Sequence, residues 1–166
     1  MLNLNLFEID EIIEELLESN QFPQLISYFS QLSNLINKND YSFSFYVRFL
    51  SLCLAIIRRM ASVPKFRIKT QEKYFGFVMD GLNRMESEIE NKNEETSFFF
   101  KELSAVLGIF SLDNNIVNDL INKNVSSCLL KIALIHFDGA KLVKTILGFI
   151  TNFATSGLYT PKKTYK

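Results

Sequence analysis

The sequence offers few side chains from which a catalytic site could be built. It contains one histidine, His136, and two cysteines, Cys53 and Cys128. A cysteine nucleophile needs a base such as histidine within hydrogen-bond reach. Cys128 and His136 fall in one predicted helix, but eight residues separate them, and at about two helical turns apart their side chains cannot meet. A pair formed by Cys53 and His136 would need a contact between distant segments that nothing in the sequence indicates.

Motifs for metal, phosphate or acid–base chemistry do not occur either. One histidine and two separate cysteines do not make the Cys/His cluster of a zinc site, and the sequence has no GxxxxGK[ST] or GxGxxG phosphate loop. Asp113, Asn115 and Val117 do not complete an EF-hand calcium loop. The carboxylates of residues 14–18 belong to an acidic helix and should face solvent. We therefore predict a protein that is not an enzyme and uses no metal, cofactor or small-molecule substrate.

The charged residues form blocks of alternating sign. The formal net charge of the 166-residue chain is zero, yet segments 8–18 and 86–95 are acidic and segments 48–73 and 162–166 are basic. Nucleic-acid-binding proteins usually present a net positive surface, so we predict no nucleic-acid partner. A local basic stripe around Arg58 is the alternative, and we interpret that segment as a solvated helix face.

The sequence carries no signal for secretion or for a membrane. Its first residues lack the basic region and long apolar core of a secretory signal, and their acidic residues are untypical of a transit peptide. The most apolar stretch, 43–57, is interrupted by Arg48 and is shorter than the roughly 20 residues that span a bilayer. Two isolated cysteines suit a reducing compartment. We predict a cytoplasmic location, with the nucleus as the alternative, and no membrane partner.

Apolar residues recur at helical spacing along most of the chain, which predicts an all-α fold. The stripe over residues 9–17 follows the i, i+3, i+4, i+7 pattern of one helix face, and only three prolines and six glycines interrupt the chain. The helix over 42–60 is apolar almost all round, which predicts that it is the most buried. The predicted helices cover residues 5–18, 22–36, 42–60, 70–90, 98–112, 116–121, 127–136 and 139–155.

Two segments near opposite ends of the chain resemble each other. Ile12–Ile26 (IIEELLESNQFPQLI) aligns without gaps with Ile116–Leu130 (IVNDLINKNVSSCLL). A second pair of similar segments is VLGIF at 106–110 and ILGFI at 146–150. Their spacing is about 40 residues, which is the period of armadillo and HEAT repeats. Such units repeat because one unit cannot bury its own apolar face, so neighbours stack and share a core.

Two short motifs resemble the armadillo repeat more specifically. The residues at 20–26, Asn-Gln-Phe-Pro-Gln-Leu-Ile, are similar to the junction between the family's first and second helices, and Thr151–Ala154 is similar to the end of its third helix. Asn20 or Asn124 in a left-handed turn would replace the family's usual glycine, since asparagine tolerates positive φ. The resemblance implies an armadillo-like α-solenoid of about three helical repeat units; a non-repeat α-helical bundle is the alternative.

The resemblance also implies a division of the chain. We predict a single armadillo-like domain over residues 1–155, with units at about 5–61, 62–112 and 113–155. The middle unit lacks its short first helix. Residues 156–166 form a basic tail that we expect to be flexible.

The function implied by the resemblance is that of a scaffold or adaptor that binds another protein or a peptide along its third helices. We predict that polar groups interrupting the most apolar helices bind the partner: Arg48, Arg59, Lys101, Lys144 and Asn152. In peptide-binding members of the family, an Asn at the position of Asn152 pairs with the peptide backbone, and a Trp one turn earlier shapes a pocket. Here that earlier position is Gly148 and the chain has no Trp, which argues against nuclear-signal-type peptides and favours a helix-end role for Asn152.

Two other functions stay open at this point. The chain could be a structural subunit buried in a larger multiprotein assembly, which its 16 phenylalanines would favour if they formed an exposed patch. It could also be an enzyme, but that function requires a cluster of titratable groups that the sequence does not nominate.

Overall fold

The fold is described by a computed structural model that covers residues 6–32 and 41–158. All regular elements in these residues are helical, which confirms the all-α prediction. The α-helices are α1 (Leu6–Glu18), α2 (Gln21–Leu32), α3 (Tyr41–Ser62), α4 (Arg67–Met85), α5 (Glu94–Phe110), α6 (Asn114–Asn122), α7 (Val125–Ile135) and α8 (Ala140–Leu158), and two 3₁₀ turns, η2 (Pro64–Phe66) and η3 (Glu86–Glu88), follow α3 and α4. None of the helices in these two ranges has the length and apolar character needed to cross a bilayer.

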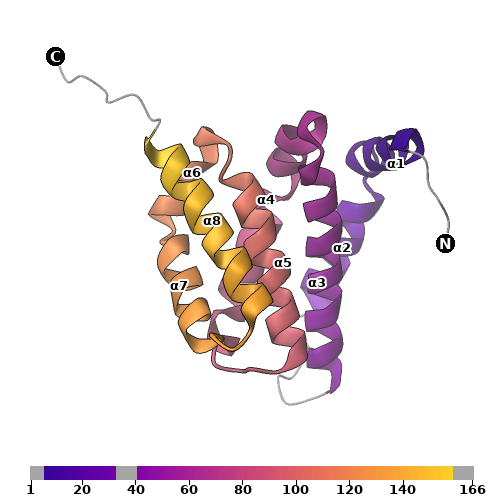
Figure 1. Ribbon diagram of the computed structural model, residues 1–166. Coiled ribbons are helices and arrows are strands. Elements are labelled where there is room, and N and C mark those ends of the chain that lie inside the picture. Colours follow the sequence, from indigo (N-terminus) through magenta and orange to yellow (C-terminus); the bar gives the residue numbers. More distant parts are fainter. Residues whose placement is uncertain (1–5, 33–40, 159–166) are drawn as a thin grey trace.

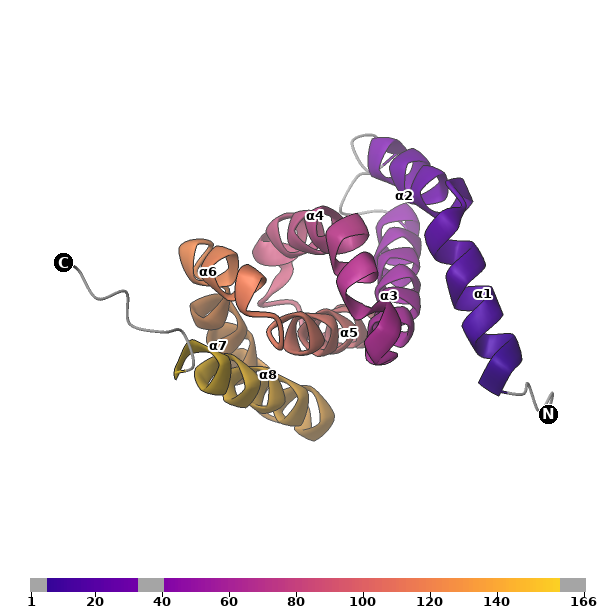
Figure 2. The same ribbon diagram turned by 90° about the horizontal axis from the view of Figure 1, so that it is seen from above.

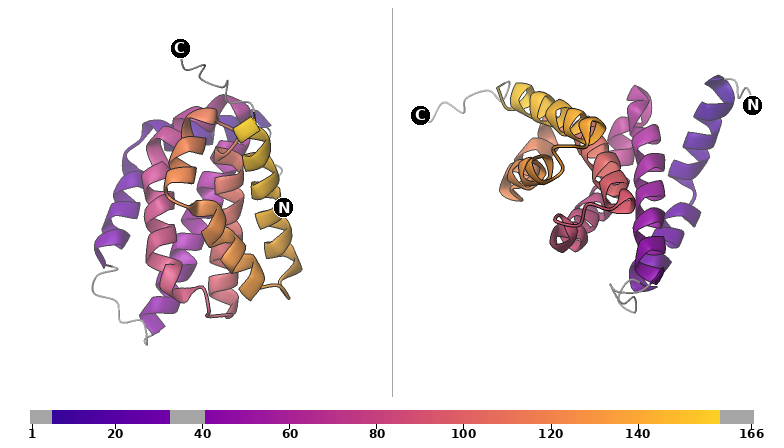
Figure 3. Two further views of the ribbon diagram at one scale, coloured as in Figure 1. Left: turned by 90° about the vertical axis from the view of Figure 1, so that its left-hand side faces the viewer. Right: turned by 60° about the horizontal axis from the view of Figure 1, so that its bottom comes forward.

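Three long helices, α3, α5 and α8, lie side by side in that order (Figure 1). The ion pairs between α3 and α5 show that these two helices run in the same direction. Arg48 pairs with Glu95, and the later Arg58 pairs with the later Glu102. Helix α4 packs on α3 and α5, and α6 and α7 pack on α8, so these helices form a second layer behind the first (Figure 2). The α1–α2 pair lies at one end of the molecule and α6–α8 at the other (Figure 3).

The centre of the core is α5, and the prediction that the helix over 42–60 is the most buried was wrong. Six large apolar side chains of α5 have an exposed fraction of 0%: Phe99, Phe100, Leu103, Val106, Leu107 and Phe110. Helix α3, by contrast, leaves Phe45, Leu52 and Ile56 exposed. The physical reason is position, since α5 lies between α3 and α8 and also contacts α4, whereas one side of α3 faces solvent.

Two helices begin earlier than the sequence pattern predicts. The side chain of Asn93 accepts a hydrogen bond of 2.8 Å from the Thr96 backbone N–H, and this cap starts α5 at Glu94 instead of 98. Glu94 and Glu95 then occupy the first turn, where the helix dipole favours carboxylates. Helix α4 begins at Arg67 because the preceding 3₁₀ turn leads directly into it.

Helix α4 ends at Met85, five residues before the predicted end at 90, and the 3₁₀ turn η3 follows it. The other helix boundaries within the described residues agree with the prediction to within about three residues. Helix α2 ends at Leu32, and the predicted continuation to 36 and the turn at 37–40 lie outside the described residues. Helix α8 ends at Leu158, three residues past the predicted domain end, and the rest of the predicted tail also lies outside them.

The left-handed turn predicted at Asn20 or Asn124 is found at Asn124. Its φ is 53°, and it is the one non-glycine residue with positive φ in the part of the chain that the structure describes. It precedes α7 directly and turns the chain from α6 into α7. Asn20, the other candidate, does not adopt this conformation.

Candidate interaction surface

The outward sides of α3, α5 and α8 form one continuous surface, which we call the three-helix face. Its members on each helix are three or four residues apart, so they lie on one side of that helix. They are Phe45, Arg48, Leu52, Ile56 and Arg59 on α3, Glu94, Phe98 and Lys101 on α5, and Lys141, Lys144 and Gly148 on α8.

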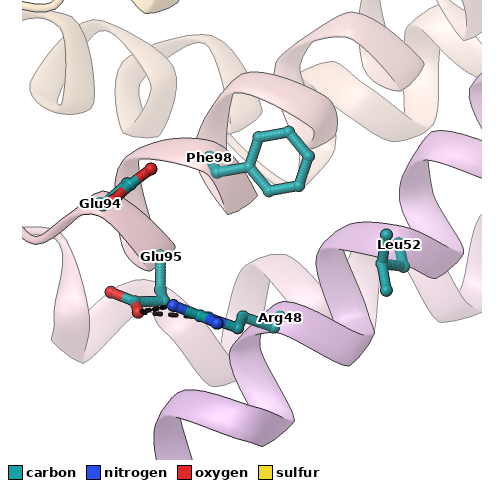
Figure 4. A pocket seen from close by; sticks show the side chains of 5 residues that line it. All are labelled: Arg48, Leu52, Glu94, Glu95 and Phe98. Carbon is teal, nitrogen blue, oxygen red and sulfur yellow. Dashed lines mark hydrogen bonds and ion pairs between the residues drawn. The ribbon is translucent and has the colours of Figure 1, made fainter.

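A hollow of about 340 Å³ lies between α3 and α5 on this face (Figure 4). Leu52, 58% exposed, and Phe98, 37% exposed, supply its apolar wall. At its rim, Arg48 donates from Nη2 and Nε to the same Glu95 oxygen, at 2.7 and 3.2 Å. The hydrogen bond from Arg48 lowers the pKa of Glu95, so this pair stays charged at neutral pH.

A second hollow of about 430 Å³ lies between α5 and the start of α8. It shares Glu94 and Phe98 with the first hollow, so the two adjoin and Phe98 stands between them. Lys101 and Lys141 supply its positive charges. The Lys101 Nζ lies 4.7 Å from the centre of the Phe98 ring, a cation–π contact that holds the ring on this face.

Beneath the face, Glu102 joins α5 to α3. Its side chain is buried, and its carboxylate accepts a hydrogen bond of 2.7 Å from Arg58 Nε and lies 3.1 Å from Lys101 Nζ. One carboxylate is therefore neutralised by two cations. Arg58 is partly buried in this link, so the interpretation of its segment as a purely solvated face was wrong at this residue.

Four of the five residues predicted to bind a partner lie on the three-helix face: Arg48, Arg59, Lys101 and Lys144. The fifth, Asn152, is partly buried, and its Nδ2 donates a 3.0 Å hydrogen bond to the Gly108 carbonyl oxygen. Asn152 thereby fastens α8 to α5 near their carboxyl ends. A contact between any of the five residues and a partner stays a prediction.

The sequence prediction missed the apolar part of the face, namely Leu52, Ile56 and Phe98. A signal was available, because Arg48 and Arg59 are eleven residues apart, about three helical turns, and so lie on the same side of their helix. That side contains Leu52 and Ile56, which must then be exposed with the two arginines.

The candidate nucleophiles and bases are engaged elsewhere in the fold. His136 caps the end of α7, and its Nε2 lies 2.8 Å from the Ile89 carbonyl oxygen. Cys53 is buried, and burial raises its pKa to about 12, so the thiol stays protonated. No group of three or more His, Cys, Asp or Glu residues suited to a metal ion occurs within the described ranges.

A separate apolar patch lies on the second half of α7 and the turn that follows it, at the end of the molecule opposite α1. We call it the α7 patch, and it consists of Leu130, Leu134 and Phe137, which are 46, 76 and 74% exposed. The Lys92 Nζ lies 5.5 Å from the centre of the Phe137 ring. Leu134 and Phe137 are among the most exposed large apolar side chains described.

No protein-family model, curated protein or solved structure matches this chain, so its function must be inferred from the geometry of these surfaces.

Proposed function

We propose that this chain is a non-catalytic scaffold or adaptor that binds another protein through the three-helix face, on an armadillo-like stack of three helical units. The order of the helices supports the stack. The groups α1–α2–α3, α4–α5 and α6–α7–α8 correspond to the units at about 5–61, 62–112 and 113–155, and each group ends in a helix of the front layer.

The direction of neighbouring helices also favours a stack over a simple bundle. In an up-and-down bundle, helices joined by short loops alternate in direction. Here α3 and α5 are parallel neighbours, with α4 returning the chain behind them. The middle unit has no short first helix, and the Pro64–Phe66 turn stands in its place.

The observation that carries the proposal is the exposed apolar centre of the face. Leu52, Ile56 and Phe98 are 58, 39 and 37% exposed, and Leu52 and Phe98 flank a hollow whose rim carries Arg48 and Glu95. Apolar side chains surrounded by a charged rim are typical of protein-binding surfaces, where a few large apolar groups contribute most of the binding energy.

The test is a comparison of partner binding between matched surface variants. Leu52→Asp combined with Ile56→Asp places charge in the centre of the face, at positions exposed enough to leave the core intact. Ile68→Asp is the control, because Ile68 is 60% exposed on α4, away from the face. Partners captured by the wild-type chain from its native host are identified by mass spectrometry and then tested for direct binding as purified proteins.

We expect a direct partner to lose most of its affinity for the double variant and to keep it for Ile68→Asp. Circular dichroism and urea unfolding establish that both variants are folded. A partner that binds the double variant as tightly as the wild type would exclude the three-helix face as its binding surface.

The α7 patch favours a second function, that of a structural subunit of a larger assembly. Leu134 and Phe137 are more exposed than any large apolar residue of the three-helix face, and such exposure is typical of surfaces that are covered in a complex.

A further inference from the structure

Charge is separated between the front layer and the rest of the molecule. Helix α3 carries three arginines and no acidic residue, α8 carries two lysines and no acidic residue, and α5 carries one lysine and three glutamates. The three helices together therefore carry a net charge of +3. Because the formal charge of the chain is zero, the remaining segments carry −3.

The acidic residues of the front layer are largely used within the fold. Glu95 pairs with Arg48, and Glu102 is shared by Arg58 and Lys101. Three cations of the face, Arg59, Lys141 and Lys144, are exposed, and their charged side chains form no hydrogen bond or ion pair with any described residue.

These unpaired cations lie on both sides of the apolar centre. Arg59 follows Leu52 by seven residues, two turns along the same side of α3. Lys141 lines the second hollow beside Phe98, and Lys144 lies one turn further along α8. A ligand that fills the hollows next to Phe98 therefore has positive charge on its α3 side and on its α8 side.

We infer that the three-helix face binds an acidic segment of a partner protein, in which a large apolar side chain enters the hollows beside Phe98 and flanking carboxylates meet Arg59, Lys141 and Lys144. The inference rests on the proposed function and specifies the chemistry of the partner. Carboxylates at these positions complement the net charge of the layer, and such complementarity sets partner choice and association rate more than it sets affinity.

A protein segment fits this surface better than a nucleic acid does. The cations are separated by Leu52, Ile56 and Phe98, whereas a phosphate backbone is bound by a continuous row of positive charges. Glu94 borders both hollows and would repel a carboxylate there as it would a phosphate, so the hollows suit the apolar side chain of the segment and its carboxylates must lie at the flanking cations.

Gly148 offers a way to block the face without disturbing the core. A Cβ atom at Gly148 would meet no atom within 4 Å, and the same holds for Gly76 on α4. Gly148 is seven residues after Lys141, which puts it on the same side of α8, whereas Gly76 belongs to the second layer. Gly148→Phe should therefore obstruct a ligand, and Gly76→Phe is the matched control.

The test begins with a selection from a random 16-residue peptide library displayed on phage, with the wild-type chain as bait. Peptides that also bind Gly148→Phe are removed. We expect the selected sequences to be enriched in Asp and Glu around one Phe, Leu, Ile or Trp. Enrichment in Lys and Arg, or no enrichment over the Gly148→Phe variant, overturns the inference.

The dissociation constant of the best selected peptide is then measured by fluorescence anisotropy. Reversal of both α8 charges, Lys141→Glu with Lys144→Glu, should weaken binding about tenfold or more, and increased salt should weaken it further. The control, Lys123→Glu with Lys131→Glu, reverses two exposed lysines in the same third of the chain and should change the constant less than about twofold. Equal effects of the two reversals would overturn the inference.

Two further outcomes separate this inference from the proposed function. If the selected peptides are uncharged and apolar, and their binding still depends on Leu52 and Ile56, the acidic partner is excluded while the binding function stands. If single-stranded DNA or heparin binds the wild-type chain more tightly than any peptide, and the α8 reversal abolishes that binding, the partner is a polyanion and the inference is wrong.

Discussion

At the scale of single residues, Glu102 is the one acidic side chain that is buried in the part of the chain that the structure describes. Its side chain is 4% exposed, and a buried charge is costly unless cations and hydrogen bonds compensate it. Arg58 of α3 provides the shorter contact, at 2.7 Å, and the neighbouring Lys101 the longer one, at 3.1 Å. The position of α3 against α5 therefore depends on Arg58.

Arg58→Ala should lower the free energy of unfolding by about 1–2 kcal/mol, less than for a fully buried pair because the Arg58 side chain is 39% exposed. Arg59→Ala, an exposed neighbour on the same helix, should change it by less than about 0.5 kcal/mol. The double variant Arg58→Ala with Glu102→Leu should recover most of the loss, since it removes the buried charge as well. Urea unfolding measures all three values, and equal effects of Arg58→Ala and Arg59→Ala would contradict the assignment.

The two cysteines should differ in their reaction with thiol reagents. Burial raises the pKa of Cys53 to about 12, and the reactive species is the thiolate, so the folded chain should protect Cys53 at pH 8. Cys128 is only partly buried, and although burial also raises its pKa, its greater access should make it react first. Mass spectrometry of iodoacetamide-treated protein follows the reaction of both cysteines. In 8 M urea, where the chain is unfolded, we expect the two cysteines to react at equal rates. Equal rates in the folded chain would show that Cys53 is not buried.

At the scale of elements, α1 depends on a residue from another helix for its carboxyl end. The last turn of α1 contains no basic residue, yet a helix carboxyl end attracts positive charge. Lys73 of α4 donates to the carbonyl oxygens of Leu17 and Ser19, the latter at 3.0 Å. This contact joins the first helix of the chain to the second layer.

Lys73→Met should remove this cap while keeping most of the apolar contact of the side chain. We expect a loss of about 1 kcal/mol and faster hydrogen exchange confined to the amides of α1. Lys69→Met is the control, because Lys69 lies 3.6 Å from Glu18 in an exposed ion pair, a type of contact that contributes little. Hydrogen exchange that rises equally in both variants would mean that Lys73 does not cap α1.

Most of the helices could be predicted from the sequence, because apolar spacing and polar breaks are local signals. The starts of α4 and α5 could not, since they depend on a 3₁₀ turn after Pro64 and on a side-chain cap by Asn93. The burial of α5 relative to α3 was not predictable either. An apolar pattern shows that a helix is buried, but which helix lies at the centre of the core depends on how all the helices pack together.

The candidate surface could also be predicted only in part, because local sequence signals do not show which apolar residues the packing leaves exposed. Charged residues within apolar helices could be recognised from the sequence, and Arg48, Arg59, Lys101 and Lys144 do lie on one face. Residue type alone does not distinguish the exposed Leu52 and Phe98 from core residues; the spacing of Arg48 and Arg59 indicates the exposure of Leu52, but no such signal marks Phe98. Asn152 was predicted from the sequence to bind a partner, but its side chain donates a hydrogen bond to the Gly108 carbonyl oxygen within the fold.

At the scale of the whole molecule, the two exposed apolar surfaces differ in the charge around them. The three-helix face combines apolar side chains with unpaired cations on α3 and α8, which suits a partner that is selected by charge. The α7 patch lies at the end of the layers, and two lysines lie near its three apolar side chains: Lys131, which follows Leu130 in the sequence, and Lys92, whose Nζ is 5.5 Å from the centre of the Phe137 ring. Apolar contact there would be driven by burial of area with little charge selection.

Self-association is the expected consequence of the α7 patch when no partner is present. Burial of Leu134 and Phe137, which are 76 and 74% exposed, is favourable by about 25 cal/mol per Å² of apolar surface, so the isolated chain should associate as its concentration rises. Leu134→Glu with Phe137→Glu should restore a monomer in size-exclusion chromatography with light scattering, whereas Ile68→Glu should not. A wild-type chain that stays monomeric at high concentration would leave the α7 patch without a role in self-association, and association lost only on substitution of Leu52 and Ile56 would assign it to the three-helix face.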